Sequence, residues 1–249
     1  MSHAFILSRY LFDIQLINIL RFYGLVNLLF RTGLNVILSS ILKMVDSQNF
    51  SGILIFLIVL LFSVSVHELM HALVAYRLGD DLAHSAGRIS LNPLKHIDPF
   101  LSIALPGILL LLGMPPILAA KPVPINTSRI DGEELGLAAV GIAGPLTNLA
   151  LAIVVTSLLK ALNPQGFMYD LMELFITLNV SLFVFNMLPI PPLDGSRVLY
   201  TVAPIGMQRV MDKIESFGLL AIIFLLTFLS PVIFPVIDNA RQFILNILL

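Results

Sequence analysis

The chain has 249 residues, of which 58% are hydrophobic and only 12% are charged, and its mean hydropathy is +0.98. Soluble domains carry about 25% charged residues, so this composition excludes an ordinary soluble protein and predicts an all-α polytopic membrane protein built as a bundle of transmembrane helices. The formal net charge of −1 argues against nucleic-acid binding, and the lack of cysteine excludes disulfides and cysteine-ligated zinc sites.

Residues 1–50 are expected to form a separate N-terminal region that is helical, amphipathic and membrane-associated. Its segment 11–44 is apolar, yet a polar residue recurs at every fourth position from Asn27 through Arg31, Asn35 and Ser39 to Lys43. This spacing predicts a helix lying on the membrane surface, or a helix pair packed on the bundle. The alternative is an ordinary first transmembrane helix with a few tolerated polar residues.

Residues 51–249 are expected to form the main domain. Four of its apolar segments are long enough to span a bilayer: 52–77, 135–160, 172–190 and 216–236. A fifth segment, 100–119, is interrupted by prolines and glycines, which membrane helices tolerate. The loops on either side of it, 80–99 and 121–134, contain turn signals and could contribute short membrane-associated β-strands.

The pentapeptide from His67 to His71 is the most informative motif of the chain. Histidines at positions i and i+4 lie on one face of a helix, where both can bind one Zn²⁺. The intervening Glu68 has the position of a general base acting on a water at the metal. The pentapeptide lies inside the first apolar segment, where ionisable side chains are costly and usually functional.

A catalytic zinc needs a third protein ligand, and the motif does not supply it. The nearest downstream candidates are loop residues: His84, His96, Asp80, Asp81 and Asp98. The more distant Asp194 interrupts a proline-rich, otherwise uncharged run that begins at Asn186. Because non-helical backbone at membrane depth is tolerated where it is buried in protein or lines a cavity, this run is typical of a functional site.

These motifs together resemble the site-2 protease family of intramembrane zinc metalloproteases. The resemblance rests on His67 to His71, on Gly144-Pro145-Leu146-Thr147-Asn148 and on the run from Asn186 to Gly195. The stretches 87–93 and 120–124 resemble the small prokaryotic branch, which lacks accessory PDZ and CBS domains. The similarity covers about residues 52–200, which we take as the catalytic core.

The resemblance implies a function for each motif. His67, His71 and Asp194 would bind one Zn²⁺, and Glu68 would be the catalytic base. Asn148 and Asn186 would lie near the substrate strand or the oxyanion. The reaction would be hydrolysis of a peptide bond in or next to a transmembrane segment, with single-span membrane proteins as substrates.

The positions of the ligands also constrain the topology. Asp194 can reach the two histidines only if segments 52–77 and 172–190 end at the same membrane face. Segment 100–119 is then re-entrant or lies along the bundle. Most lysines and arginines after residue 76 gather at that face, whereas the loop between the next two spans offers only Lys160. The positive-inside rule makes this face cytoplasmic, so we expect the site toward the cytoplasmic side of a prokaryotic cell membrane.

Other interpretations stay open for single residues. Asp194 could be a loop carboxylate or a helix N-cap, and Asn148 could make an interhelical hydrogen bond. Asn186 could bind backbone groups that Pro189 frees. Gly144-Pro145 is expected to mark the start of a helix.

For the whole chain, the alternative is a zinc-binding membrane protein without catalysis, either a transporter or an inactive protease relative. A transporter is expected to show internal repeats and ionisable residues through several spans. An inactive relative is expected to have lost Glu68, which this chain retains.

Overall fold

Three long apolar helices form the framework of the protein. They appear in a computed structural model that describes residues 50–92, 95 and 124–249. The helices are α2 (Phe50–Arg77), α5 (Glu133–Leu162) and α6 (Phe167–Asn186). Among the described residues, these three are long and apolar enough to cross a membrane. The expected all-α membrane protein is therefore confirmed, and these helices correspond to the first three predicted spans.

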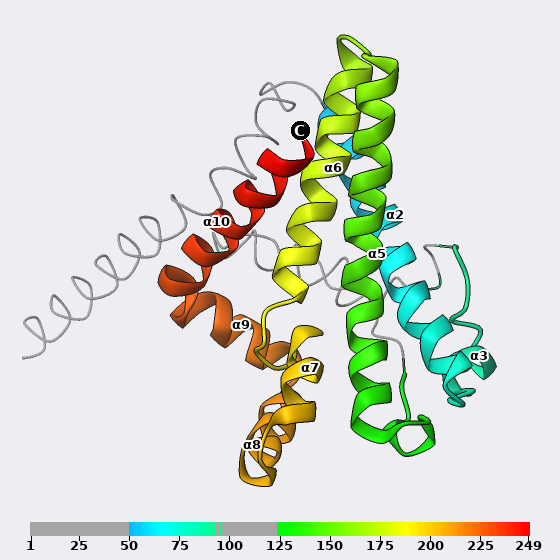
Figure 1. Cartoon of the computed structure of the whole chain (residues 1–249), viewed down its shortest axis with the longest axis vertical. Helices are drawn as coiled ribbons and strands as arrows, with labels where there is room; N and C mark the ends of the chain where they lie inside the picture. The colour runs from blue at the N-terminus through cyan, green and yellow to red at the C-terminus, as the bar shows by residue number, and fades with distance from the viewer. Residues whose placement is uncertain (1–49, 93–94, 96–123) are drawn as a thin grey trace, which may run out of the picture.

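The central helix of the framework is α5. In Figure 1, α2 and α6 descend in the same direction and α5 runs back the opposite way. The contacts of α5 with α2, α6 and α7 (Gly195–Val202) are the most extensive between elements, whereas α2 and α6 touch each other little. Residues on α5 are therefore placed to contact both of the other long helices.

The chain leaves α2 and returns to α5 at the same end of the bundle. The backbone N–H of Asp131 donates to the carbonyl of Leu78 at 2.7 Å. The N–H of Asn126 donates to a carboxylate oxygen of the buried Asp80 at 2.6 Å. Segment 100–119, which we expect to be re-entrant, lies outside the described residues.

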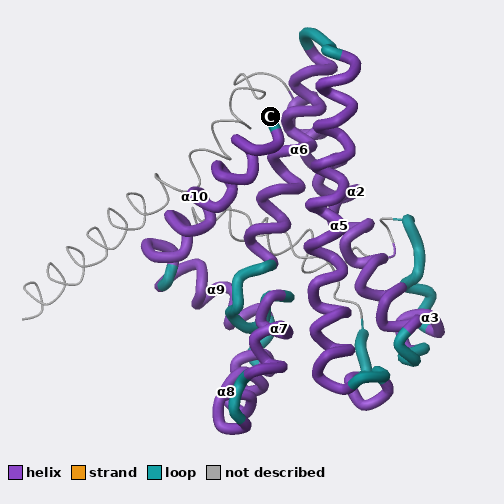
Figure 2. Tube along the Cα trace, in the orientation of Figure 1, coloured by secondary structure: helices purple, strands orange, loops and turns teal. Residues whose placement is uncertain are grey.

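The described parts of the two flanking loops contain helical turns and no strands (Figure 2). They hold the short helix α3 (Leu82–Ser85) and the 3₁₀ turn η3 (Thr127–Arg129). Asp80 accepts a hydrogen bond from the backbone N–H two residues later, and Asn126 does the same. Because such side-chain contacts compete with strand pairing, the expected strands do not form in these residues.

The C-terminal part differs from the prediction. After α7 come α8 (Ile205–Ser216), α9 (Leu219–Phe228) and α10 (Ser230–Leu248). The predicted continuous span over 216–236 is wrong, because the chain breaks between α9 and α10. Pro231 lies in the first turn of α10, and proline has no N–H to continue the preceding helix.

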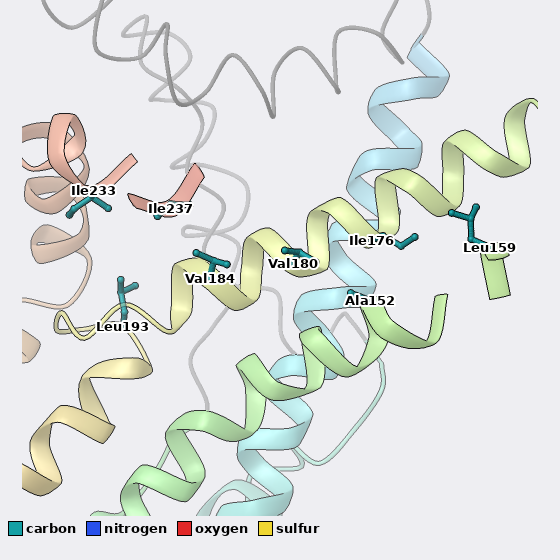
Figure 3. Packing of buried hydrophobic residues seen from close by; sticks show 8 residues of the cluster. All are labelled: Ala152, Leu159, Ile176, Val180, Val184, Leu193, Ile233 and Ile237. Atoms are coloured by element: carbon teal, nitrogen blue, oxygen red, sulfur yellow. The ribbon is translucent and has the colours of Figure 1, made fainter. Parts of the chain in front are cut away.

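The last helix, α10, packs against α6 and shields the loop that follows α6. Buried apolar side chains from α5, α6 and α10 form one cluster with Leu193 (Figure 3). In lipid, packing of this kind replaces the hydrophobic effect as the source of helix association. The cluster fixes the loop immediately before Asp194 against the bundle.

Small residues let neighbouring segments approach α5 closely. A Cβ atom at Gly141 would lie 2.9 Å from the backbone oxygen of Asp194. The expectation that Gly144-Pro145 marks a helix start is wrong, because α5 begins at Glu133 and Pro145 lies inside it. Membrane helices tolerate an internal proline where neighbouring groups compensate for the lost hydrogen bond.

The two sides of α2 differ in polarity. Leu54, Ile58 and Phe62 are exposed, each four residues from the next, and form an apolar face suited to lipid. Ser63, His67 and His71 have the same spacing but are 0%, 6% and 6% exposed. The helix therefore presents its polar side chains to the interior of the bundle.

Candidate metal centre

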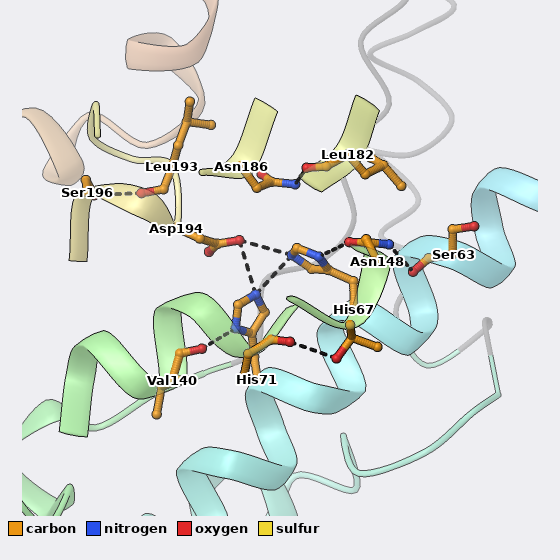
Figure 4. Close-up of polar contacts among 12 residues, drawn as sticks. Ser63, His67, His71, Val140, Asn148, Leu182, Asn186, Leu193, Asp194 and Ser196 are labelled. Atoms are coloured by element: carbon orange, nitrogen blue, oxygen red, sulfur yellow. Dashed lines mark hydrogen bonds and ion pairs between the residues drawn. The ribbon is translucent and has the colours of Figure 1, made fainter. Parts of the chain in front are cut away.

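Three side chains converge between α2, α5 and the loop before α7 (Figure 4). The Nε2 atoms of His67 and His71 lie 3.0 Å apart. One carboxylate oxygen of Asp194 lies 3.0 Å from Nε2 of His67 and 3.2 Å from Nε2 of His71. These three residues are also the group among the described residues that could hold a metal ion.

The geometry of this group fits a tetrahedral metal ion. Ligand atoms bound to zinc at about 2.1 Å in a tetrahedron are about 3.4 Å apart, close to the observed separations. A Cβ atom at position 144 would lie only 2.4 Å from Nε2 of His71 and 2.7 Å from Nε2 of His67. The missing side chain of Gly144 therefore keeps space open beside the two ligand nitrogens.

The second ring nitrogen of each histidine is held by a group on α5. Nδ1 of His71 donates to the backbone carbonyl of Val140 at 2.7 Å. Nδ1 of His67 lies 2.5 Å from the side-chain oxygen of Asn148. Because these oxygens accept hydrogen bonds, each histidine carries its proton on Nδ1 and keeps the Nε2 lone pair for a metal.

Asp194 reaches the histidines because the chain turns sharply after α6. The proline-rich run between Met187 and Leu193 contains no regular element, and Gly195 then packs against the carbonyl of Met187. Asp194 occupies the N-cap position of α7, but its side chain makes no capping hydrogen bond. Its carboxylate points to the two histidines instead, so the N-cap interpretation does not hold.

The electrostatics of Asp194 favour the ionised form that a metal cation requires. Burial by itself raises the pKa of this carboxyl. When protons rather than a metal cation occupy Nε2 of the two histidines, their positive charge and hydrogen bonds outweigh the burial and hold the pKa of Asp194 well below its usual range.

Comparisons with known proteins agree with this site. The family model for peptidase family M50 matches residues 160–229, which include Asp194. The chain is 37% identical over 203 residues to "Putative zinc metalloprotease YwhC" of Bacillus subtilis, covering 76% of this chain and 89% of the relative. This chain belongs to peptidase family M50. No solved structure matches the chain. Two further relatives fit the membership of family M50. One is "Putative zinc metalloprotease Rip2" of Mycolicibacterium smegmatis, 33% identical over 67% of this chain and 64% of the relative. The other is "Putative zinc metalloprotease MJ0611" of Methanocaldococcus jannaschii, 37% identical over 61% of this chain and 73% of the relative.

Membership of M50, the site-2 protease family, confirms the resemblance that the motifs indicated. The cofactor of this M50 chain is Zn²⁺, as expected from its zinc metalloprotease relatives and from the His-His-Asp group. The individual roles of His67, His71 and Asp194 stay predictions, which their convergence supports.

The predicted base of this M50 chain lies next to the ligands. Glu68 follows His67 on α2, is partly buried, and is close enough to His71 for their charges to interact. Its role as the base also stays a prediction.

The two asparagines occupy different surroundings. Asn148 is fully buried behind His67 and makes interhelical hydrogen bonds, as the second interpretation of this residue expected. Asn186 donates to the carbonyl of Leu182 within its own helix (Figure 4). The substrate or oxyanion roles of both residues stay predictions.

The other candidate ligands in the described residues have different partners. His84 is exposed and stacks on Tyr76, with the ring centroids 4.7 Å apart. Asp80 binds backbone amides, and Asp81 pairs with Arg129. His96 and Asp98 lie outside the described residues.

The sequence interpretation missed two residues next to the site of this M50 chain. Ser63 and Asn179 are fully buried and are hydrogen-bonded to each other. Their sequence signals are weak: Ser63 stands one helical turn before His67, and Asn179 interrupts the apolar segment 172–190. The hydrogen bond from His71 to Val140 could not be predicted, because it uses a backbone carbonyl that any residue would supply.

Proposed function

We propose that this chain is an intramembrane zinc endopeptidase, which hydrolyses a peptide bond in or next to a transmembrane segment of membrane-protein substrates. The observation that carries the proposal is that His67, His71 and Asp194 come together, and that both histidines lie on a helix able to span a membrane. His67 precedes the end of α2 at Arg77 by ten residues, which places it about 15 Å inside that end.

The chemistry follows from the residues around the ligands. When bound, Zn²⁺ supplies a Lewis acid that lowers the pKa of a water to about 7 and polarises the substrate carbonyl. The two histidines and Asp194 would hold the ion as its three protein ligands. The Glu68 carboxylate takes a proton from the attacking water and then passes it to the amine of the departing chain.

A route for water is supported by a polar cavity next to the site. This cavity has a volume of about 570 Å³, and its lining includes Glu133, Ser196, Arg197 and Asp212. Ser196 and Arg197 follow Asp194 closely on α7. Water filling this cavity would stand next to the loop that carries the third ligand.

A docking place for the substrate is supported by an apolar groove of about 520 Å³. The groove is formed by α8, α9 and the proline-rich loop, and its lining includes Ile190, Phe217, Leu220 and Phe224. Pro191 lines both the groove and the polar cavity. A substrate transmembrane segment lying in the groove would therefore have one end close to water and to Asp194.

The charges support a membrane orientation with the site toward the cytoplasm. α3, α7 and α8 lie together at the end of the bundle where α2 ends (Figure 1). This end carries most of the described basic residues: Arg77, Arg88, Lys95, Arg129, Arg197, Arg209 and Lys213. Lys160 lies near the opposite end, and Arg241 on α10 is buried and paired with Asp238. By the positive-inside rule, we place the first end on the cytoplasmic side of a prokaryotic cell membrane.

The decisive experiment compares wild type with Glu68→Gln, both reconstituted in liposomes with a single-span substrate. Zinc content is measured in parallel by mass spectrometry. Because Glu68 is the proposed base and not a ligand, we expect equal zinc content and a loss of cleavage of roughly 10²- to 10⁴-fold. If wild type shows no cleavage above that of Glu68→Gln, with zinc bound in both, the proposal fails. The chain would then be a zinc-binding membrane protein without protease activity of its own.

A further inference from the structure

A chain of buried side-chain amides connects α6 to the metal ligand His67. Asn148 donates through Nδ2 to the side-chain oxygen of Asn179 at 2.9 Å. Asn179 in turn donates through Nδ2 to the hydroxyl of Ser63 and to the carbonyl of Phe175, both at 2.9 Å. Ser63, Asn148 and Asn179 are each 0% exposed, so water does not compete for these bonds.

The direction of every hydrogen bond in this chain follows from its end at Phe175. A backbone carbonyl only accepts, so the Nδ2 end of Asn179 must face it, and the Oδ1 end must face Asn148. Asn148 then presents Nδ2 to Asn179 and Oδ1 to His67. A side-chain oxygen next to Nδ1 of His67 is satisfied only when that nitrogen carries the proton.

We propose that Asn179 and Ser63 are positioning residues, which act through Asn148 to hold His67 in the tautomer that binds zinc. The inference rests on the proposed zinc site and adds two residues that do not touch the ion. Asn179 orients the Asn148 amide, and Ser63 provides a further acceptor that keeps the Asn179 amide in place. The proton on Nδ1 leaves the lone pair of Nε2 for an ion that would lie between this nitrogen and the Asp194 carboxylate.

The two histidine ligands therefore differ in how their tautomers are set. His71 donates directly to the carbonyl of Val140, so no side chain is needed. His67 depends on side chains from two other helices, α5 and α6. A substitution at Asn179 should consequently disturb His67 and leave His71 unchanged.

The test uses the full-length protein in lipid nanodiscs and two readouts that do not need catalysis. The zinc dissociation constant is measured by competition with a fluorescent chelator. The Nδ1–H of His67 is followed by NMR on zinc-loaded, ¹⁵N-histidine-labelled protein, with His67→Gln to assign its signals, because without the ion a proton would occupy the Nε2 that faces the Asp194 carboxylate. We expect the Nδ1–H of wild-type His67 to exchange slowly with water.

The variants are Asn148→Leu, Asn179→Leu and Ser63→Ala. Loss of the direct partner in Asn148→Leu should raise the zinc dissociation constant roughly 10- to 100-fold, which is typical for residues that support a metal ligand. Asn179→Leu should raise it by roughly tenfold, with faster exchange of the His67 Nδ1–H, and Ser63→Ala by less. The His71 signals should not move.

Matched controls come from the same helices. Thr156 on α5 is buried, and its hydroxyl has no hydrogen-bond partner among the described residues, so Thr156→Val should leave zinc affinity unchanged. Ser65 on α2 is buried, and its one bond among the described residues goes to Leu61 within its own helix, which makes Ser65→Ala the control for Ser63→Ala.

Two results would overturn the inference: zinc-loaded wild type whose His67 carries no protected Nδ1–H, or folded Asn179→Leu with a zinc affinity within roughly twofold of wild type. If Asn179→Leu does not fold, Ser63→Ala against Ser65→Ala and the wild-type tautomer decide. Wild type that binds zinc with the expected tautomer but cleaves nothing would refute the proposed protease alone. Cleavage by wild type with unchanged zinc affinity in the variants would refute the positioning role alone.

Discussion

Substitution of Gly144 by alanine should weaken zinc binding at the site while leaving the bundle folded. The added Cβ would lie 2.4 Å from Nε2 of His71 and 2.7 Å from Nε2 of His67. Ordinary contact begins at 3.4 Å, so the two nitrogens must move by about 1.0 Å and 0.7 Å, respectively. Metal–ligand distances tolerate only about 0.2 Å, so neither histidine can absorb the shift and keep its full interaction with the ion.

The rings cannot simply rotate away, because both Nδ1 atoms are held by α5. Overpacking of this kind costs about 1–3 kcal/mol, which corresponds to roughly 5- to 150-fold weaker zinc binding if the cost falls on the site. The assay is the zinc dissociation constant together with circular dichroism of the purified protein. Gly206→Ala is the control, because nothing lies within 4 Å of its Cβ. Stoichiometric zinc in Gly144→Ala at unchanged affinity would refute the close approach of α5 to the ligands.

Two further substitutions separate positioning of the site from stability of the bundle. In Gly195→Ala the Cβ would lie 2.3 Å from the carbonyl oxygen of Met187, so Asp194 should be displaced. Zinc affinity should then fall at least roughly tenfold with the helix content retained, and unchanged affinity would show that this turn does not hold the ligand. Asp80→Ala removes a buried carboxylate that accepts two backbone hydrogen bonds, at 3.0 Å and 2.6 Å, and should cost about 3 kcal/mol or more of unfolding free energy. Asp81→Ala breaks only an exposed ion pair and should cost less than about 1 kcal/mol. Thermal unfolding in detergent compares the two, and equal melting temperatures would contradict the clamping role of Asp80.

Elements that depend on local pattern were predictable from the sequence. The long apolar runs predicted the helices α2, α5 and α6, because a bilayer requires about 20 apolar residues in one helix. The pattern failed where backbone chemistry interrupts an apolar run. Segment 216–236 is apolar enough to span, yet a new helix, α10, begins at Ser230 inside it, with Pro231 in its first turn. The expectation of a helix start at Gly144-Pro145 was also wrong, because α5 runs on through Pro145, which membrane helices tolerate.

The same division holds for the metal centre. The spacing of His67 and His71 by itself predicted two zinc ligands, since residues four apart share a helix face. Asp194 was reachable from sequence only through its unusual proline-rich setting and the family resemblance. Tertiary structure alone decided that Gly144 leaves space for the ion and that Val140 and Asn148 orient the histidines. It also decided that Asn179 stands behind Asn148. These depend on how three helices approach one another, which no local pattern of residues encodes.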